Sequence, residues 1–171
     1  MSKISAAKLL MSVILLGGSV LSFFLDWSPN HLLNPLWHPH ARFHGALLLF
    51  FLAGVSLTGT WLLWRRSGEP EVAFKVVLSI IICYWTPLFF IPFLLPSASW
   101  WAGRQGAEPR IDGIVFYPNL AVAALLLIVT IAVYRMAQAA LRNDRGTRLG
   151  VHENGSGAKK SGESSVRIGF Q

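Results

Sequence analysis

The chain has 171 residues, of which 53% are hydrophobic and 13% are charged. This charged share is about half the ~25% of an ordinary soluble domain, so the composition excludes a typical soluble protein and predicts an integral membrane protein. The formal net charge of +7 would suit a nucleic-acid partner, but its distribution along the chain, described below, indicates membrane orientation instead, and we expect no nucleic-acid partner.

Four runs without a charged residue define the expected architecture. Each is close to or above the ~18 apolar residues that a helix needs to cross the ~30 Å hydrocarbon core. The short segments between them leave no room for a separate soluble domain. We therefore predict an all-α, multi-pass protein of a cell or organelle membrane, with four transmembrane helices in an up-down antiparallel bundle. The runs cover residues 9–25, 45–64, 76–95 and 114–134.

The first run predicts a helix over about residues 6–25, with a cleaved signal peptide as the alternative. Lys3 and Lys8 form a basic flank, and Gly17-Gly18-Ser19 resembles a small-residue cleavage site. The apolar run continues to Leu25, however, and is longer than the ~7–15 residues of a usual signal-peptide core. We therefore expect this segment to be retained as a membrane helix.

Prolines predict where the second helix begins and where the third helix is kinked, and a Gly-rich composition distinguishes the tail. Pro39 is expected at the first position of a second helix over 39–64, where its missing N–H costs nothing. The third helix, over about 74–96, contains Pro87, Pro92 and Pro96, and such prolines kink a membrane helix. The fourth is expected over about 114–140. The Gly-, Ser- and Lys-rich tail over 142–171 predicts a disordered, basic cytoplasmic segment.

The basic residues are divided unequally between the two sides of the expected bundle. Twelve of the 15 Lys and Arg residues fall on the side of both termini. The positive-inside rule therefore predicts cytoplasmic termini and places the segment between the first two helices outside. The three on the other side are Arg42, Arg104 and Arg110.

Four of the five histidines lie within fourteen residues of that outer segment, and we call His31, His38, His40 and His44 the histidine cluster. His40 and His44 are four residues apart and so share a helix face. Asp26 lies at the end of the first helix, and Asn34 and Arg42 lie among the histidines. Polar and ionisable groups at a membrane boundary are costly and commonly functional, so the sequence predicts a site here.

Several interpretations of this site remain open. In acid/base chemistry on an apolar substrate, Asp26, His31, His40 and His44 are the candidate catalytic residues, since histidine changes charge near neutral pH. The candidate ligand-binding residues are then Asn34, His38, Arg42 and Tyr117. Alternatively, His38, His40 and His44 hold a divalent metal, or His40 or His44 is an axial ligand of haem. The structural alternative is a polar network, with an Asp26–Arg42 ion pair, that locks the outer end of the bundle.

The outer segment contains Asp26-Trp27, His31, Asn34-Pro35, Trp37 and Pro39-His40-Ala41-Arg42-Phe43-His44. This pattern resembles the signature of an uncharacterised family of small four-helix membrane proteins. The resemblance covers about twenty residues and implies the four-helix fold without an activity. The architecture is more distantly similar to the emopamil-binding, sterol isomerase-like proteins, which place acid/base residues inside a bundle, and to DoxX-like accessory subunits.

Taken together, these patterns favour a membrane protein that binds or transforms a lipid-like or apolar ligand at its outer face. The alternative is a non-catalytic accessory or structural subunit. The expected partners are the lipid bilayer, a lipid-like small molecule, and a membrane-protein partner or a second copy of the chain.

Overall fold

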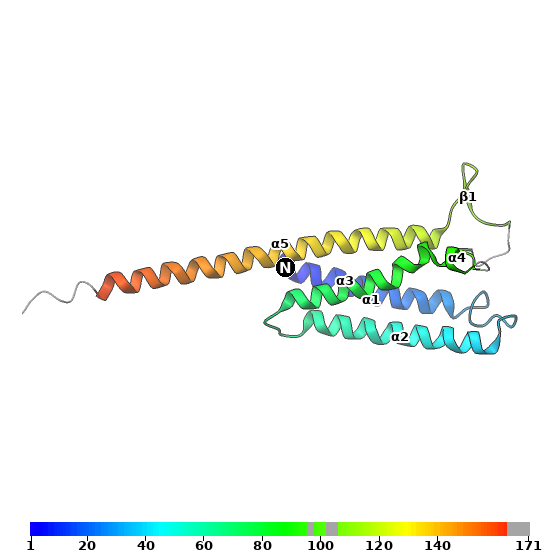
Figure 1. The fold of residues 1–171 in the computed structure, drawn as a ribbon, viewed down its shortest axis with the longest axis horizontal. Helices are drawn as coiled ribbons and strands as arrows, with labels where there is room; N and C mark the ends of the chain where they lie inside the picture. Colours follow the sequence, from blue (N-terminus) through cyan, green and yellow to red (C-terminus); the bar gives the residue numbers. More distant parts are fainter. Residues whose placement is uncertain (96–97, 102–105, 164–171) are drawn as a thin grey trace, which may run out of the picture.

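The computed structural model describes residues 1–95, 98–101 and 106–163, and the side chains of these residues as far as Thr147. It is predominantly helical (Figure 1). The elements are α1 (Lys3–Asp26), α2 (Pro39–Trp64), α3 (Pro70–Trp85), the 3-10 turn η1 (Thr86–Phe89), α4 (Ile91–Leu94), β1 (Arg110–Ile111), β2 (Ile114–Val115) and α5 (Pro118–Glu163).

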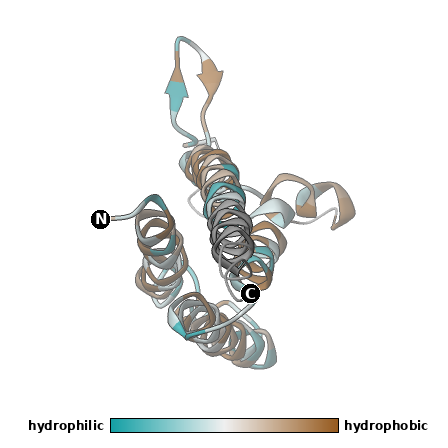
Figure 2. Cartoon of the chain, turned by 90° about the vertical axis from the view of Figure 1, so that its left-hand side faces the viewer, coloured by the Kyte–Doolittle hydropathy of each residue, from teal (hydrophilic) through white to brown (hydrophobic). Residues whose placement is uncertain are grey.

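Four helical segments of the described chain are long and apolar enough to cross a membrane, as predicted: Lys3–Asp26, Pro39–Trp64, Pro70–Phe89 and Pro118–Thr147. Hydrophobic residues predominate along these helices (Figure 2), and many large apolar side chains are exposed. Phe24, Phe51 and Ile128, for example, are 79%, 66% and 65% exposed. A water-soluble monomer rarely exposes so many large apolar side chains, whereas a bilayer solvates them.

The four long helices pack side by side. α1 contacts α2 and α5, and α3 contacts the same two helices. The segment between α1 and α2 lies at the same end of the bundle as α4 and the hairpin of β1 and β2, and the 65–69 connection lies at the opposite end (Figure 1). The core between the helices is apolar, and its almost fully buried large side chains include Met11, Leu63, Phe74, Val77 and Ile81.

Some glycines of the long helices lie where a neighbouring helix approaches closely, and others do not. A Cβ on Gly18 would lie 3.1 Å from the Trp85 ring, and one on Gly59 would lie 2.9 Å from Leu15. Gly17 and Gly54, by contrast, have nothing within 4 Å of a built Cβ. A larger residue at 18 or 59 would therefore require Trp85 or Leu15 to shift, whereas one at 17 or 54 would not.

The third helix differs from the expected span of 74–96. Its α-helical part begins at Pro70 and ends at Trp85, and the chain then passes through η1 into the short α4. Pro87 and Pro92 are the physical reason, because each removes a backbone donor and clashes with the preceding turn. Residue 96 lies outside the described residues.

The last helix also differs from the expected boundaries of 114–140. Residues 110–115 form an antiparallel hairpin, whose turn places Asp112 and Gly113 at φ 50° and 81°, and α5 begins at Pro118. Its backbone stays helical to Glu163, where we expected a disordered tail. No proline follows Pro118, so the helix, once nucleated, propagates one residue at a time. Residues 164–171 of that tail lie outside the described residues.

Candidate functional site

The structure divides the histidine cluster into two groups. The first group is His40 and His44, on the first two turns of α2. Their Nε2 atoms are 3.0 Å apart and their rings meet edge to face, which confirms the predicted shared face. Both side chains are exposed. One ring nitrogen donates and the other accepts, so this contact needs at least one neutral imidazole.

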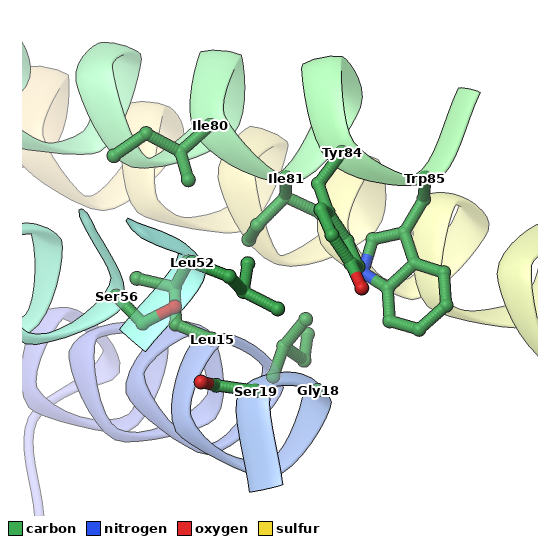
Figure 3. A pocket seen from close by; sticks show the side chains of 10 residues that line it. Leu15, Gly18, Ser19, Leu52, Ser56, Ile80, Ile81, Tyr84 and Trp85 are labelled. Carbon is green, nitrogen blue, oxygen red and sulfur yellow. The ribbon is translucent and has the colours of Figure 1, made fainter. Parts of the chain in front are cut away.

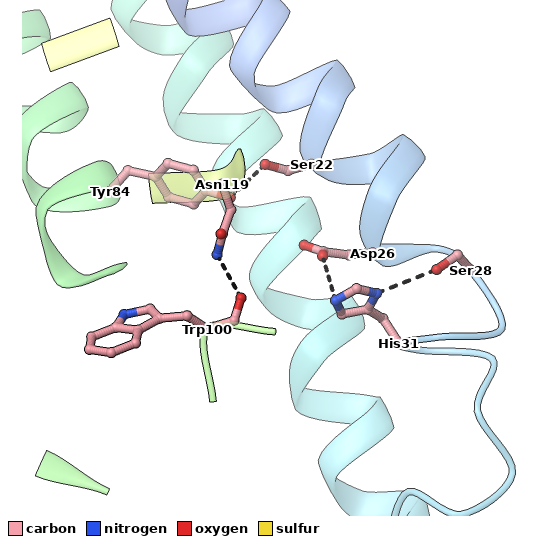
Figure 4. Close-up of polar contacts among 7 residues, drawn as sticks. All are labelled: Ser22, Asp26, Ser28, His31, Tyr84, Trp100 and Asn119. Atoms are coloured by element: carbon pink, nitrogen blue, oxygen red, sulfur yellow. Dashed lines mark hydrogen bonds and ion pairs between the residues drawn. The ribbon is translucent and has the colours of Figure 1, made fainter. Parts of the chain in front are cut away.

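The second group is His31 with Asp26 and Ser28, at the junction of α1 and the following loop (Figure 4). His31 Nε2 lies 3.9 Å from Asp26 Oδ1, and the two side chains are 31% and 40% exposed. On the other side of the ring, Nδ1 lies 3.4 Å from Ser28 Oγ. A separation of 3.9 Å exceeds hydrogen-bond distance, so the carboxylate keeps lone pairs free to accept from another donor.

The remaining polar residues of this segment bond to the loop itself. Arg42 Nε–H donates to the carbonyl of Leu32 at 2.7 Å, and the Leu32 N–H donates to the carbonyl of Asp26 at 3.0 Å. The Asn34 side chain accepts from the N–H of Leu36. These contacts fix the path of the chain from α1 to α2 around the buried Leu32 side chain.

The expected Asp26–Arg42 ion pair is therefore not formed. Both residues belong to the described part of the chain, where the basic side chain within 4.0 Å of the Asp26 carboxylate is that of His31. The backbone carbonyl of Leu32 takes the place of a carboxylate, because it lies within reach of the guanidinium once the loop has folded back on α2.

His38 has a structural position. Its Nδ1 accepts from the backbone N–H of His40 at 3.2 Å, so it is the N-cap of α2, with Pro39 at the predicted first position. A ring nitrogen used in this way is not free to bind metal alongside His40 and His44. Within the described residues, no group of three or more His, Cys, Asp or Glu side chains is placed to hold a metal ion. His40 and His44 alone offer two ligands, where a structural zinc site takes four.

Sequence reasoning missed a polar contact deeper in the bundle. Tyr84 Oη of α3 and Ser22 Oγ of α1 lie 2.6 Å apart, and Ser22 precedes Asp26 by one helical turn on the same face of α1. The contact connects α1 to α3 near the Asp26–His31 pair, one helical turn from Asp26 (Figure 4). The available signal was the i, i+4 spacing of two polar residues at the end of an apolar helix.

Tyr117 is not brought to the histidines by any contact among the described residues. Its ring packs against Trp100, with centroids 5.5 Å apart. The Trp100 indole N–H donates to the Leu88 carbonyl at 2.6 Å, and the Asn119 amide donates to the Trp100 carbonyl at 3.1 Å. These bonds attach the segment before α5 to η1, so Tyr117 has a packing role here.

Tyr84 also lines two cavities. A small internal one, of about 10 Å³, lies among α1, α2 and α3 and contains the hydroxyl groups of Ser19 and Ser56 in its wall (Figure 3). The larger is a groove of about 570 Å³ on the surface between α2 and α3. Leu48, Phe51 and Val55 form its α2 wall. The groove is mainly apolar and large enough for part of a lipid-sized ligand.

Comparisons with protein-family models, with curated proteins and with solved structures found no match to this chain.

Proposed function

We propose that this chain is a multi-pass integral membrane protein whose Asp26–His31 pair is the polar end of a site for a lipid-like ligand at the outer membrane face. The observation that carries the proposal is the position of Tyr84. Its ring lines the apolar groove, while its hydroxyl bonds to Ser22, one turn from Asp26. Apolar surface for a ligand and ionisable groups therefore meet at one point of the bundle.

The chemistry proposed for this site is proton transfer or proton-coupled binding. The Asp26 carboxylate faces one nitrogen of the His31 ring, and Ser28 faces the other. Such a carboxylate–imidazole pair suits a general acid or base. Both side chains remain partly exposed, so a ligand group can approach them without a rearrangement of the helices.

A non-catalytic structural role is the second candidate, and specific contacts favour it for part of the cluster. Asn34, His38 and Arg42 direct their polar atoms at the backbone of the loop and of α2. We therefore assign these three residues to holding the loop, and reserve the functional role for Asp26 and His31. In this division His40 and His44 are an exposed pair whose loss leaves the site intact.

The up-down arrangement with both termini in the cytoplasm belongs to the same proposal. It is supported by the twelve-to-three division of the Lys and Arg residues. Single cysteines introduced on a Cys83→Ala background test it with a membrane-impermeant thiol reagent. Ala107→Cys is expected to be labelled from outside, and Ser161→Cys only after permeabilisation. The opposite pattern would place the site on the inner face.

Complementation tests the functional role in cells that lack their own copy of the gene. Asp26→Asn and His31→Gln are expected to abolish complementation while the folded protein accumulates normally and melts within a few degrees of wild type. The matched control is His38→Asn, which keeps an N-cap acceptor on α2 and is expected to complement. If Asp26→Asn and His31→Gln lose activity only in proportion to folded protein, the pair is structural.

A further inference from the structure

The groove between α2 and α3 has a polar stripe along its α3 wall. Lys75, Ser79 and Cys83 all line it, and their spacing of four residues places them above one another on a single helix face. From Lys75 to Tyr84 the groove follows α3 for ~13.5 Å, at 1.5 Å per residue. The groove is thus long and apolar, with one cation near the beginning of α3.

Among the residues that the structure describes, the Lys75 ammonium has no counter-charge. Glu71, one turn earlier, is bonded to Arg145 at 3.0 Å, and no carboxylate of the described residues lies within 4.0 Å of Lys75. The side chain is exposed, which on this face means exposure to the membrane. A lysine in such a position extends its ammonium toward the headgroup region and gains most if an anion meets it there.

The end of the bundle at which Lys75 lies is generally basic and aromatic. The Lys8 ammonium lies 6.0 Å from the centre of the Trp64 ring, and the Arg65 guanidinium lies 5.6 Å from that of Trp61. Tryptophan rings mark the headgroup level of a bilayer. Lys8 and Arg65 are thus occupied by aromatic rings, whereas Lys75 faces the groove.

We propose that this groove is a binding site for an anionic phospholipid, with one acyl chain between α2 and α3 and the phosphate against Lys75. The apolar α2 wall, formed by Leu48, Phe51 and Val55, contacts the chain. The Ser79 hydroxyl, one turn beyond Lys75, offers a second donor to the ester region. The inference shares this groove and the membrane location with the proposed function, but it does not depend on the chemistry of Asp26 and His31.

The test uses the full chain in nanodiscs of equal parts phosphatidylglycerol and phosphatidylcholine, with bound lipids counted by native mass spectrometry. Wild type is expected to retain phosphatidylglycerol in excess. Lys75→Gln is expected to reduce that excess about fivefold, the factor typical of one lysine near an anionic surface, and Lys75→Arg is expected to keep it. Lys3→Gln, which removes a charge from the exposed beginning of α1, is the matched control and is expected to change it little.

A second pair of variants tests the acyl-chain contact independently of charge. Val55→Trp fills the groove and is expected to reduce the number of retained lipids of both kinds. Leu57→Trp adds the same bulk on α2 at a side chain that is 63% exposed and outside the groove, and is expected to have no effect. Circular dichroism and melting curves establish that each variant is folded.

Three results would overturn this inference. One is an unchanged phosphatidylglycerol excess in folded Lys75→Gln. Another is equal lipid retention by Val55→Trp and Leu57→Trp. The third is a lipid-free dimer that Val55→Trp converts to monomer, which would make the groove an interface between two copies. Asp26→Asn separates the two proposals, because it is expected to keep the lipid excess even where it abolishes complementation.

Discussion

The contact between Tyr84 and Ser22 allows the most specific prediction of stability, because removing the Tyr84 hydroxyl and removing the Ser22 hydroxyl have different consequences. Ser22 lies on α1 and is buried, whereas Tyr84 lies on α3 and is partly buried. Without the Tyr84 hydroxyl, Ser22 can turn its own hydroxyl to the carbonyl one helical turn earlier. Without the Ser22 hydroxyl, the Tyr84 hydroxyl has no such backbone carbonyl as an alternative partner.

We therefore expect Tyr84→Phe to lower the free energy of unfolding by about 0.5 kcal/mol, as is usual for a hydrogen bond between membrane helices. Ser22→Ala is expected to lower the free energy of unfolding by about 1–2 kcal/mol, because it leaves the Tyr84 hydroxyl without its hydrogen-bond partner. The value is in the lower part of the range for such a group because Tyr84 is only partly buried. The double variant should resemble Tyr84→Phe alone. Unfolding of the purified chain in mixed micelles of increasing dodecyl sulfate content, followed by circular dichroism, measures all three.

A double-mutant cycle gives the decisive number for this pair. The interaction free energy is expected to be about 1–2 kcal/mol in magnitude, equal to the Ser22→Ala loss. Strictly additive losses, or a Tyr84→Phe loss larger than that of Ser22→Ala, would show that the 2.6 Å contact does not join α1 to α3 as described.

The same unfolding assay tests three further contacts. Gly59→Ala is expected to cost about 1–3 kcal/mol through overpacking against α1, whereas Gly54→Ala should be neutral or stabilise by up to ~1 kcal/mol. Ser56→Ala should be close to neutral, since that buried hydroxyl has no hydrogen-bond partner among the described residues. Ser12→Ala should lower the free energy of unfolding by about 1–2 kcal/mol, since its hydroxyl donates one hydrogen bond and accepts another. His38→Ala should cost about 1 kcal/mol through loss of the α2 cap. Equal losses at the two glycines, a larger loss at Ser56 than at Ser12, or no loss at His38 would each contradict the described packing.

The four long helices were predictable because membrane length and charge-free composition act locally along the chain. Pro39 at the first position of α2 followed from the same local physics. The end of α3 at Trp85 was not located, because three nearby prolines allow a kink or a break and only packing decides between them. The continuation of α5 to Glu163 depends on a helix already nucleated in the apolar region, which composition of the tail alone does not reveal.

The sequence indicates which polar residues belong to the candidate site, but not all of the contacts that they make with one another. Spacing on one helix correctly joined His40 to His44. Charge alone suggested Asp26 with Arg42, whereas the loop gives Arg42 a backbone carbonyl and leaves Asp26 to His31. Such choices depend on where the chain turns between α1 and α2. The part played by Tyr84 depends on the packing of α3 against α1, and the spacing of Ser22 and Asp26 indicates only the α1 side of that contact.

Photolabelling of the full chain tests the central claim, a lipid-like ligand beside Asp26 and Tyr84, most directly. The probe is a phosphatidylcholine with a diazirine on its acyl chain, irradiated in nanodiscs, with the modified residues identified by tandem mass spectrometry. We predict adducts on Tyr84 and Asp26 in excess over Leu57 and Ile128, which are 63% and 65% exposed on the outward faces of α2 and α5. Adducts on Leu57 and Ile128, with none on Tyr84 or Asp26, would contradict the claim.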